Sequence, residues 1–369
     1  MERPLATGME SDLLSSYAGL LFLASASVYI GSYASLPKGR KSSGGVADDD
    51  EEEDTVERIT TEDAYWFPII GSVVLFGLYL IVTKLGPEWI NLILRWYTSI
   101  TGAFSVWKAS VSFCRYAVGT ARWKECRRYD VSLKITKGAD PLQLSWRTPT
   151  MLLLPLSCLP SVLYNVTKFG QQSALLSNIL ALSFCYSGLA LIKLDSFATG
   201  CVLLSGLFLY DVWWVFGTEV MVKVATTLDV PIKLLWPKSM ILSPANGFTM
   251  LGLGDVVVPG TFIALALRYD YSHHQKGAVG RPETPFFHAT LGAYMASLAT
   301  TMAVMHVWKT GQPALLYISL RPSIILTTIG TALVRGEFGE LWSWEDGGEE
   351  PKAEQKTQGV KDAIQSAKD

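Results

Sequence analysis

The sequence has little charge. Only 17% of its 369 residues are charged and 49% are hydrophobic, with a mean hydropathy of +0.27, whereas soluble domains carry about 25% charged residues. The charged residues are concentrated in residues 37–64 and 335–369, and several stretches of about 20 residues contain almost no charged residue. Because a bilayer core is crossed by about 20 apolar residues, the composition excludes a soluble protein and predicts a polytopic membrane protein.

Paired cysteines and basic clusters are also missing. The five cysteines form no Cys-x-x-Cys pair and mostly lie in apolar sequence, which favours buried thiols over a disulfide framework. The net charge is −2 and no basic patch alternates with aromatic residues, so nucleic acid is not an expected partner. We expect no metal and no cofactor.

Several hydrolytic motifs are absent as well. The four histidines form no His-Glu-x-x-His, no span contains Gly-x-Ser-Gly, and there is no phosphate-binding loop of the Gly-x-x-x-x-Gly-Lys type. Any chemistry must therefore come from other polar groups.

The apolar stretches predict an all-α bundle of about nine transmembrane helices. The first is expected to be a retained helix, because it has no basic region before it and is longer than the apolar core of a signal peptide. The spans are expected at roughly 12–36, 65–83, 88–118, 148–167, 173–191, 198–218, 245–267, 286–308 and 313–334.

Lysine and arginine counts predict the orientation. With the N-terminus outside, the inside loops and tail hold 20 of these residues and the outside loops hold 7, which favours an N-terminus outside and a C-terminus inside. The predicted organisation is an outside segment with the first span (1–36), an acidic linker on the inside (37–64), a helical scaffold of spans two to five (65–191), the helices of spans six to nine (192–335) and a disordered tail on the inside (336–369).

Two aspartates lie deep within apolar sequence. Asp211 follows Tyr210 in the sixth span, and Asp255 follows Gly252-Leu253-Gly254 in the seventh. An aspartate at the centre of a membrane helix costs about 2.5 to 3.5 kcal/mol on insertion scales, so each needs a functional reason.

The spacing predicts that the two carboxyl groups meet. Counted from Asp195 and Asp270 at one membrane face, they lie 16 and 15 residues deep, or about 24 and 22 Å of helix. Two carboxylates about 4 Å apart repel each other by about 4 kcal/mol, so near neutral pH the pair would hold one proton. A carboxylate that accepts a proton from water, beside an acid that donates one to a carbonyl, can hydrolyse an amide directly.

These residues leave other functions open. Paired intramembrane aspartates also act as relays in proton- or ion-coupled transporters, and a non-proteolytic scaffold that binds membrane helices is compatible with them too. The outside loop from Thr218 to Pro244 is expected to be a surface loop, with a strand over 231–236 that pairs with unwound substrate as the alternative.

Three motifs in order resemble those of a known family. Tyr210-Asp211, Gly252-Leu253-Gly254-Asp255 and Pro313-Ala314-Leu315 are similar to the signatures of the intramembrane aspartyl proteases, which include presenilin and signal peptide peptidase. The sequence around residues 200–218 and 251–260 most resembles the signal peptide peptidase branch. The close match covers about residues 195–335, and the first half agrees mainly in its number of spans.

The resemblance implies a presenilin-like bundle in which Asp211 and Asp255 are catalytic. It implies that Tyr210 and the segment Gly252, Leu253 and Gly254 contact substrate, and that Pro313, Ala314 and Leu315 border the site. The implied partners are membrane-embedded signal peptides, type II transmembrane segments and the lipid bilayer, and a homo-oligomer is compatible with the family. The implied location is the endoplasmic reticulum membrane, with a luminal N-terminus and a cytosolic C-terminus.

Overall fold

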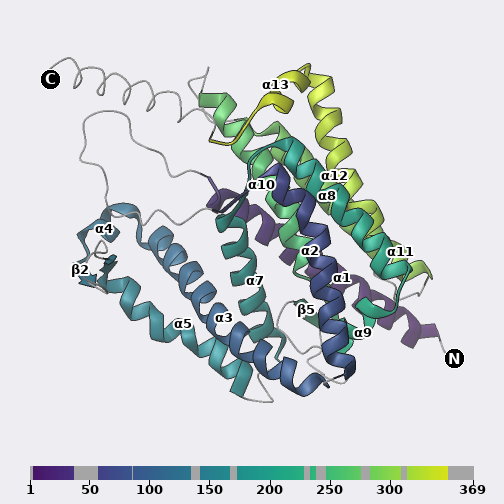
Figure 1. The fold of residues 1–369 in the computed structure, drawn as a ribbon, viewed down its shortest axis with the longest axis horizontal. Coiled ribbons are helices and arrows are strands. Elements are labelled where there is room, and N and C mark those ends of the chain that lie inside the picture. Colours follow the sequence, from purple (N-terminus) through teal and green to yellow (C-terminus); the bar gives the residue numbers. More distant parts are fainter. Residues whose placement is uncertain are drawn as a thin grey trace.

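The protein is a bundle of long helices (Figure 1). The computed structural model describes residues 3–36, 57–84, 86–133, 142–166, 173–227, 233–237, 247–275, 283–308 and 314–347. The long helices are α1 (Arg3–Ala34), α2 (Thr61–Lys84), α3 (Pro87–Val118), α5 (Thr148–Val166), α7 (Ala174–Leu191), α8 (Phe197–Asp211), α10 (Gly254–Gln275), α11 (Pro285–Trp308) and α12 (Ala314–Arg335).

Five of these helical segments are long and apolar enough to cross a membrane. They are Leu13–Ala34, Thr61–Lys84, Thr148–Val166, Ala174–Leu191 and Phe197–Trp214, which overlap five of the predicted spans and confirm a polytopic, mostly helical membrane protein. Helices α3, α10, α11 and α12 overlap the other four predicted ranges. Nine crossings stay a prediction.

Shorter elements join the long helices. They are the helices α4 (Thr120–Glu125), α9 (Val220–Thr227) and α13 (Phe338–Ser343), the π-helix η1 (Val212–Phe216), and the strands β1 (Glu57–Ile59), β2 (Arg128–Leu133), β3 (Leu142–Arg147), β4 (Ile192–Leu194), β5 (Lys233–Pro237) and β6 (Phe248–Gly252). The strands form three two-stranded sheets: β1 with β4 in parallel, and β2 with β3 and β5 with β6 antiparallel.

Helix α10 lies at the centre of the core. Every residue from Phe262 to Leu267 is at most 1% exposed, and α10 packs against α1, α7, α8 and α11. A helix that is apolar on all sides either faces lipid or is enclosed by other helices, and these contacts show that α10 is enclosed. The buried cluster around it includes Leu20, Leu189, Leu204, Leu298 and Ile324, so the core holds α10 in a fixed position.

The β5–β6 hairpin corrects two expectations. Residues 233–237 form a strand instead of a surface loop, and residues 248–252 form a strand although the seventh span was expected to be helical from 245. The helix begins only at Gly254. Pairing with β5 provides hydrogen-bond partners for the backbone N–H and C=O groups of residues 248–252, so these residues do not need a helix. The glycines at 252 and 254 also have low helix propensity.

The N-terminal edge of α2 also differs from the prediction. Residues 57–64 were assigned to a linker, but Glu57–Ile59 pairs with β4 and α2 begins at Thr61. The Asp63 carboxylate accepts hydrogen bonds from the backbone N–H and the hydroxyl of Thr60, at 3.0 and 2.8 Å. The Thr60 hydroxyl in turn accepts the Asp63 N–H at 3.4 Å, and this reciprocal cap explains why the helix starts there. Residues 37–56 lie outside the described part.

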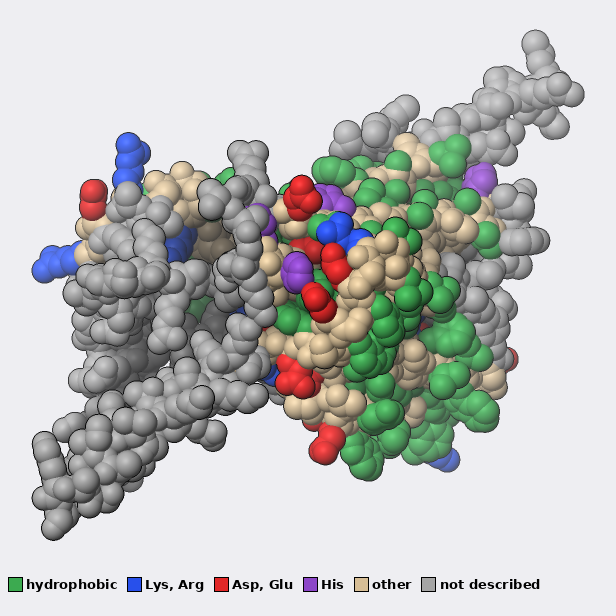
Figure 2. Space-filling view, turned by 90° about the horizontal axis from the view of Figure 1, so that it is seen from above, with side chains coloured by type: hydrophobic (Ala, Val, Ile, Leu, Met, Phe, Trp, Pro, Cys, Tyr) green, Lys and Arg blue, Asp and Glu red, His purple; other side chains and the backbone are tan. Residues whose placement is uncertain are grey.

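The end of the bundle near α13 is closed by residues expected to be disordered. Trp344, Glu345 and Asp346, here called the C-terminal clasp, follow α13. The Trp344 ring lies 5.4 Å from the ring of Tyr269 on α10, and the Asp346 N–H donates to the carbonyl of Asp195 at 2.7 Å. Figure 2, viewed onto this end, shows charged and histidine side chains gathered beside a hydrophobic surface. Aromatic burial and ionic contacts order this part of the tail.

Candidate active site

Asp211 is the last residue of α8. The helix starts after Ser196, whose hydroxyl accepts the Thr199 N–H at 3.2 Å as an N-terminal cap. Its sequence is apolar on all sides, as in a membrane span, and Leu209 is 66% exposed whereas Asp211 is only 4% exposed. The chain then widens into the π-helix η1, and such wide turns often occur at functional sites.

Asp255 lies in the first turn of α10, directly after β6. It is 9% exposed, and a helix N-terminus is a favourable place for a carboxylate because the backbone N–H groups and the helix dipole point toward it. A Cβ built on Gly252 would lie 3.4 Å from the Asp255 carboxylate. The hydroxyl of Tyr294 on α11 donates to the Asp255 carbonyl at 3.4 Å.

Arg321 on α12 was not selected from the sequence. It is 5% exposed, and its guanidinium Nη1 donates a hydrogen bond to the Asp211 carboxylate. The signal that could have found it is the same one that found the aspartates: an ionised side chain inside an apolar span is costly and needs a partner.

Helices α8 and α10 pack directly against each other. The Phe197 ring of α8 contacts the rings of Tyr269 and Phe262 on α10 edge-on, with centroids 5.6 and 5.8 Å apart. Gly200 allows this approach, since a Cβ there would lie 2.5 Å from the Phe262 ring. The two helices that carry the aspartates are therefore held against each other by close packing.

The remaining predicted site residues have mixed placements. Tyr210 packs against Trp214 at 6.3 Å and lies beside Gly71 of α2. Leu253 is buried, whereas Gly252 and Gly254 are exposed. Pro313 lies outside the described residues, and Ala314 and Leu315 begin α12.

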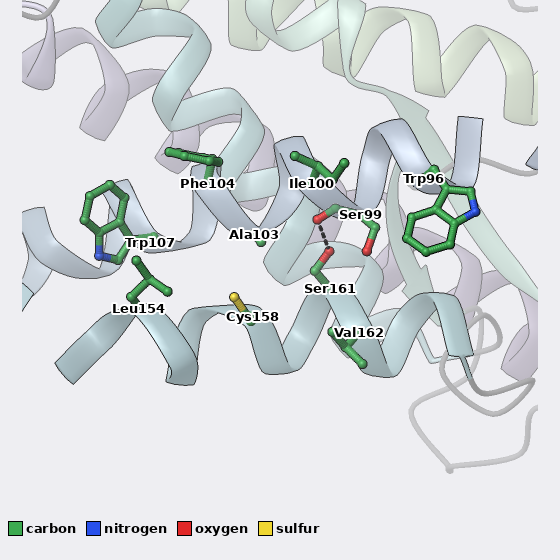
Figure 3. A pocket seen from close by; sticks show the side chains of 10 residues that line it. All are labelled: Trp96, Ser99, Ile100, Ala103, Phe104, Trp107, Leu154, Cys158, Ser161 and Val162. Carbon is green, nitrogen blue, oxygen red and sulfur yellow. Dashed lines mark hydrogen bonds between the residues drawn. The ribbon is translucent and has the colours of Figure 1, made fainter. Parts of the chain in front are cut away.

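A separate groove lies between α3 and α5 (Figure 3). Its cavity volume is about 310 Å³, and its walls include Trp96, Phe104, Trp107 and Leu154. The Ser161 hydroxyl donates to the Ser99 carbonyl at 2.7 Å. Its lining residues include no Asp, Glu, His, Lys or Arg, and none comes from α8, α10 or α12, so the groove does not form the acid-base site.

Possible metal ligands do not gather in the described residues. In these ranges no three His, Cys, Asp or Glu side chains lie together as a metal-binding group. The five cysteines are free thiols, as expected, but only Cys185 is fully buried.

The fold and its interior define a class of protein. Apolar helices of membrane-spanning length enclose buried ionisable side chains at Asp211, Asp255 and Arg321. Because such groups are costly inside a membrane, the chain is a multi-pass membrane protein with a polar site within the bundle.

Comparison with known proteins gives the family. A family model described as signal peptide peptidase matches residues 51–347. The human signal peptide peptidase is 36% identical over 340 residues, which cover 90% of this chain and 83% of the human protein. The mouse signal peptide peptidase is 35% identical over 349 residues, or 92% and 85% of the two chains. Intramembrane protease 2 of Caenorhabditis elegans is 41% identical over 200 residues, or 52% and 42%.

The chain belongs to the signal peptide peptidase family and is an intramembrane protease. This membership decides against the transporter and the non-proteolytic scaffold that the residues alone had left open.

Proposed function

We propose that the protein hydrolyses peptide bonds within remnant signal peptides and type II oriented transmembrane helices, with Asp211 and Asp255 activating water. The observation that carries the proposal is that both aspartates are buried, at 4% and 9% exposure, on helices that pack together in a membrane peptidase. The names of the human and mouse relatives support signal peptides as the substrate class.

The packing of α8 on α10 supports a shared depth for the two carboxyl groups. Asp211 lies 14 residues after Phe197, and Asp255 lies 14 residues before Tyr269, whose rings are in contact. Each aspartate is therefore about 21 Å of helix away from the same contact. On antiparallel helices, the two carboxyl groups can meet only if they lie at equal distances from this contact, and these two distances are equal.

The proposed reaction needs one carboxylate and one carboxylic acid. The carboxylate takes a proton from water, the water oxygen bonds to the peptide carbonyl carbon, and the acid gives its proton to the carbonyl oxygen. When the tetrahedral intermediate collapses, the C–N bond breaks and the leaving nitrogen takes the proton that water had released. The products are a carboxylic acid and an amine, and the aspartates return to their starting state.

The substrate must unwind before attack, and β6 offers it a strand edge. On β5, the N–H and C=O of Leu235 bond to the Asn178 side chain at 2.8 and 2.7 Å, and the Lys233 carbonyl accepts from Ser177 at 3.3 Å. That edge of β5 is thus occupied by α7, and its other edge is paired with β6.

The alternation of an antiparallel ladder then directs the backbone groups of residues 248, 250 and 252 away from β5. Met250 is 63% exposed. We assign substrate pairing to this outer edge of β6, in place of residues 231–236, whose pairing with substrate the sequence offered as the alternative to a surface loop.

Location and orientation belong to the same proposal. The excess of lysine and arginine on alternate loops favours a luminal N-terminus and a cytosolic C-terminus. The names of the human and mouse relatives say that they act on signal peptides. Signal peptides are released in the endoplasmic reticulum membrane, so we assign the protein to that membrane.

The test uses the full-length protein, purified in detergent, with a labelled signal peptide. We expect cleavage within the apolar part of the peptide, and its loss in Asp211→Asn and in Asp255→Asn. Melting temperatures of both variants are compared with the wild type, so that loss of activity is not confused with loss of fold. Cleavage that persists in either folded variant would refute the two-aspartate mechanism.

A further inference from the structure

We propose that the β2–β3 hairpin and the adjoining helix α4 bind anionic phospholipid headgroups at the membrane face on which they lie. Both elements belong to residues 119–147, here called the basic loop, which join α3 to α5. On the proposed orientation this face is cytosolic, and the cytosolic leaflet carries anionic lipids. The binding is independent of the chemistry proposed for the aspartates. It follows from the charge of the basic loop, the level of its arginines in the bilayer and the register of its two strands.

The basic loop is strongly cationic in a chain that is not. It holds seven Lys and Arg residues against three Asp and Glu residues, whereas the whole chain carries a net charge of −2. Arg122 and Arg127 are exposed, while Trp123 is buried at 7% exposure. Figure 2 shows Lys and Arg side chains at its left, the side on which Figure 1 places α4 and β2. Clusters of about four to eight basic residues beside a membrane helix attract anionic lipids.

Arginines of the basic loop lie at the level of the headgroups. Helix α5 has 19 residues, and its length of about 28 Å matches a hydrocarbon core of about 30 Å. Arg147 immediately precedes this helix. The Thr148 N–H and hydroxyl both donate to the Arg127 carbonyl, at 3.0 and 3.1 Å, so Arg127 is held at the same end of α5. Both arginines therefore lie at the boundary between the hydrocarbon and the headgroups.

The strand register places two arginines opposite each other at this boundary. Arg128 pairs with Arg147 at the end of the hairpin nearest α5, and Asp130 pairs with Ser145 two positions along. Like charges at directly opposite positions of an antiparallel pair are destabilising. Asp130 is the one acidic residue in the sequence of the two strands, against two arginines. A lipid phosphate bound at this end would supply negative charge, and arginine can bind a phosphate in a bidentate manner.

Membrane orientation alone does not require this arrangement. The excess of Lys and Arg on one side of a membrane protein depends on the number of charges near the ends of its spans, and not on their pairing in a folded hairpin. Exposed rings mark the same end of α3, where Phe113 and Tyr116 are 71% and 87% exposed. Aromatic residues are typical of the membrane interface. The cations of the folded loop thus lie beside the end of a helix that carries interfacial rings.

The first experiment measures lipid retention by the full-length protein. Purified protein in detergent is mixed with equal amounts of phosphatidylserine and phosphatidylcholine, and bound lipids are counted by native mass spectrometry. We expect selective retention of phosphatidylserine. Each basic residue near an anionic surface contributes about fivefold in affinity, so the triple variant Arg127→Gln, Arg128→Gln and Arg147→Gln should lose at least about tenfold. Wild-type protein that retains both lipids equally would overturn the proposal.

Two matched variants separate the basic loop from net charge and from loss of fold. Replacing the same three arginines by lysine keeps the charge and should preserve most of the selectivity. Lys352→Gln, Lys356→Gln and Lys361→Gln together remove an equal charge from the C-terminal tail and should leave the selectivity unchanged. If the tail variant loses as much as the loop variant, net charge explains the binding and the proposal is wrong. Selectivity that survives in the loop glutamine variant, with an unchanged melting temperature, would also refute it.

Hydrogen exchange of the wild type locates the bound lipid without any variant. Amides of residues 128–133 and 142–147 should exchange more slowly in nanodiscs that contain phosphatidylserine than in nanodiscs of phosphatidylcholine, and high salt should reduce the difference. Equal exchange in the two membranes would contradict the proposal. Equal protection by inorganic phosphate in phosphatidylcholine would identify a free anion instead of a lipid. Protection in phosphatidylcholine that disappears when the acidic run 48–54 is neutralised would assign the basic loop to that run, and the proposal would fail.

Discussion

Arg268 on α10 and Asp346 in the C-terminal clasp form an ion pair of 2.9 Å, and their side chains are 2% and 14% exposed. The same guanidinium donates to the Ser35 hydroxyl at 3.1 Å and to the Leu194 carbonyl at 3.4 Å. One side chain thus joins the end of α1, the strand that leads into α8, and the C-terminal region. The contacts hold together the ends of the two helices that carry the aspartates.

Asp346→Asn should therefore lower stability strongly. Removing one partner of a buried ion pair leaves the other charge uncompensated, which costs about 3 kcal/mol or more. The measurement is the free energy of unfolding, or the melting temperature, of the detergent-solubilised protein. Glu337→Gln is the control, because the Arg335–Glu337 pair is partly exposed and such pairs contribute at most about 1 kcal/mol. Equal losses in the two variants would contradict this view of the clasp.

Gly200→Ala should disturb the packing of α8 on α10. Its methyl group would lie 2.5 Å from the Phe262 ring, and overpacking of this kind typically costs about 1 to 3 kcal/mol. Activity should fall with stability, because the ring contact fixes the helix that carries Asp211. Gly292→Ala on α11 meets nothing within 4 Å, so it should be neutral or stabilising by up to about 1 kcal/mol.

Asn178→Ala should loosen the hairpin without touching the aspartates. It removes both side-chain bonds to the Leu235 backbone, and each unsatisfied backbone group costs about 1 to 3 kcal/mol when buried. Hydrogen exchange of the Leu235 amide should become faster. Ser177→Ala, which removes one longer bond to Lys233, is the matched control, and similar exchange at Leu235 in both variants would argue against the assigned edge.

Met250→Pro tests where the substrate pairs. Proline removes an N–H that points away from β5, so the hairpin should form while an added strand loses a donor. We expect cleavage to fall at least tenfold with little change in melting temperature. Leu251→Pro instead removes an N–H directed at β5 and should lower stability as well. Normal cleavage by Met250→Pro would rule out the outer edge of β6.

The sequence predicted the helices and both buried aspartates for a clear reason. A continuous apolar run or an isolated charge within one is a local property, so both can be recognised without neighbours. Arg321 carries the same local signal, but its role shows only through its contact with Asp211, which lies on a helix distant in sequence.

Other features depend on contacts between distant segments. Residues 248–252 are as apolar as a span, and only pairing with residues 233–237 makes them a strand. The clasp likewise looks like a solvated tail in sequence, and only the rings of Phe197 and Tyr269 beneath Trp344 give it a place to pack. Pairing and docking of this kind are not encoded in any one window of sequence.

Only Leu253 and Gly254 separate the end of β6 from Asp255, and this short connection affects the lengths of the peptides that cleavage releases. A guest strand keeps its ladder of hydrogen bonds only when it slides by two residues, because backbone groups alternate in direction along a strand. Each shift of the substrate strand by two residues therefore brings a different peptide bond to the Asp255 carboxyl group, whose position is fixed. Alternative fragments from one peptide should consequently differ by even numbers of residues, a pattern that mass spectrometry of the released pieces would reveal.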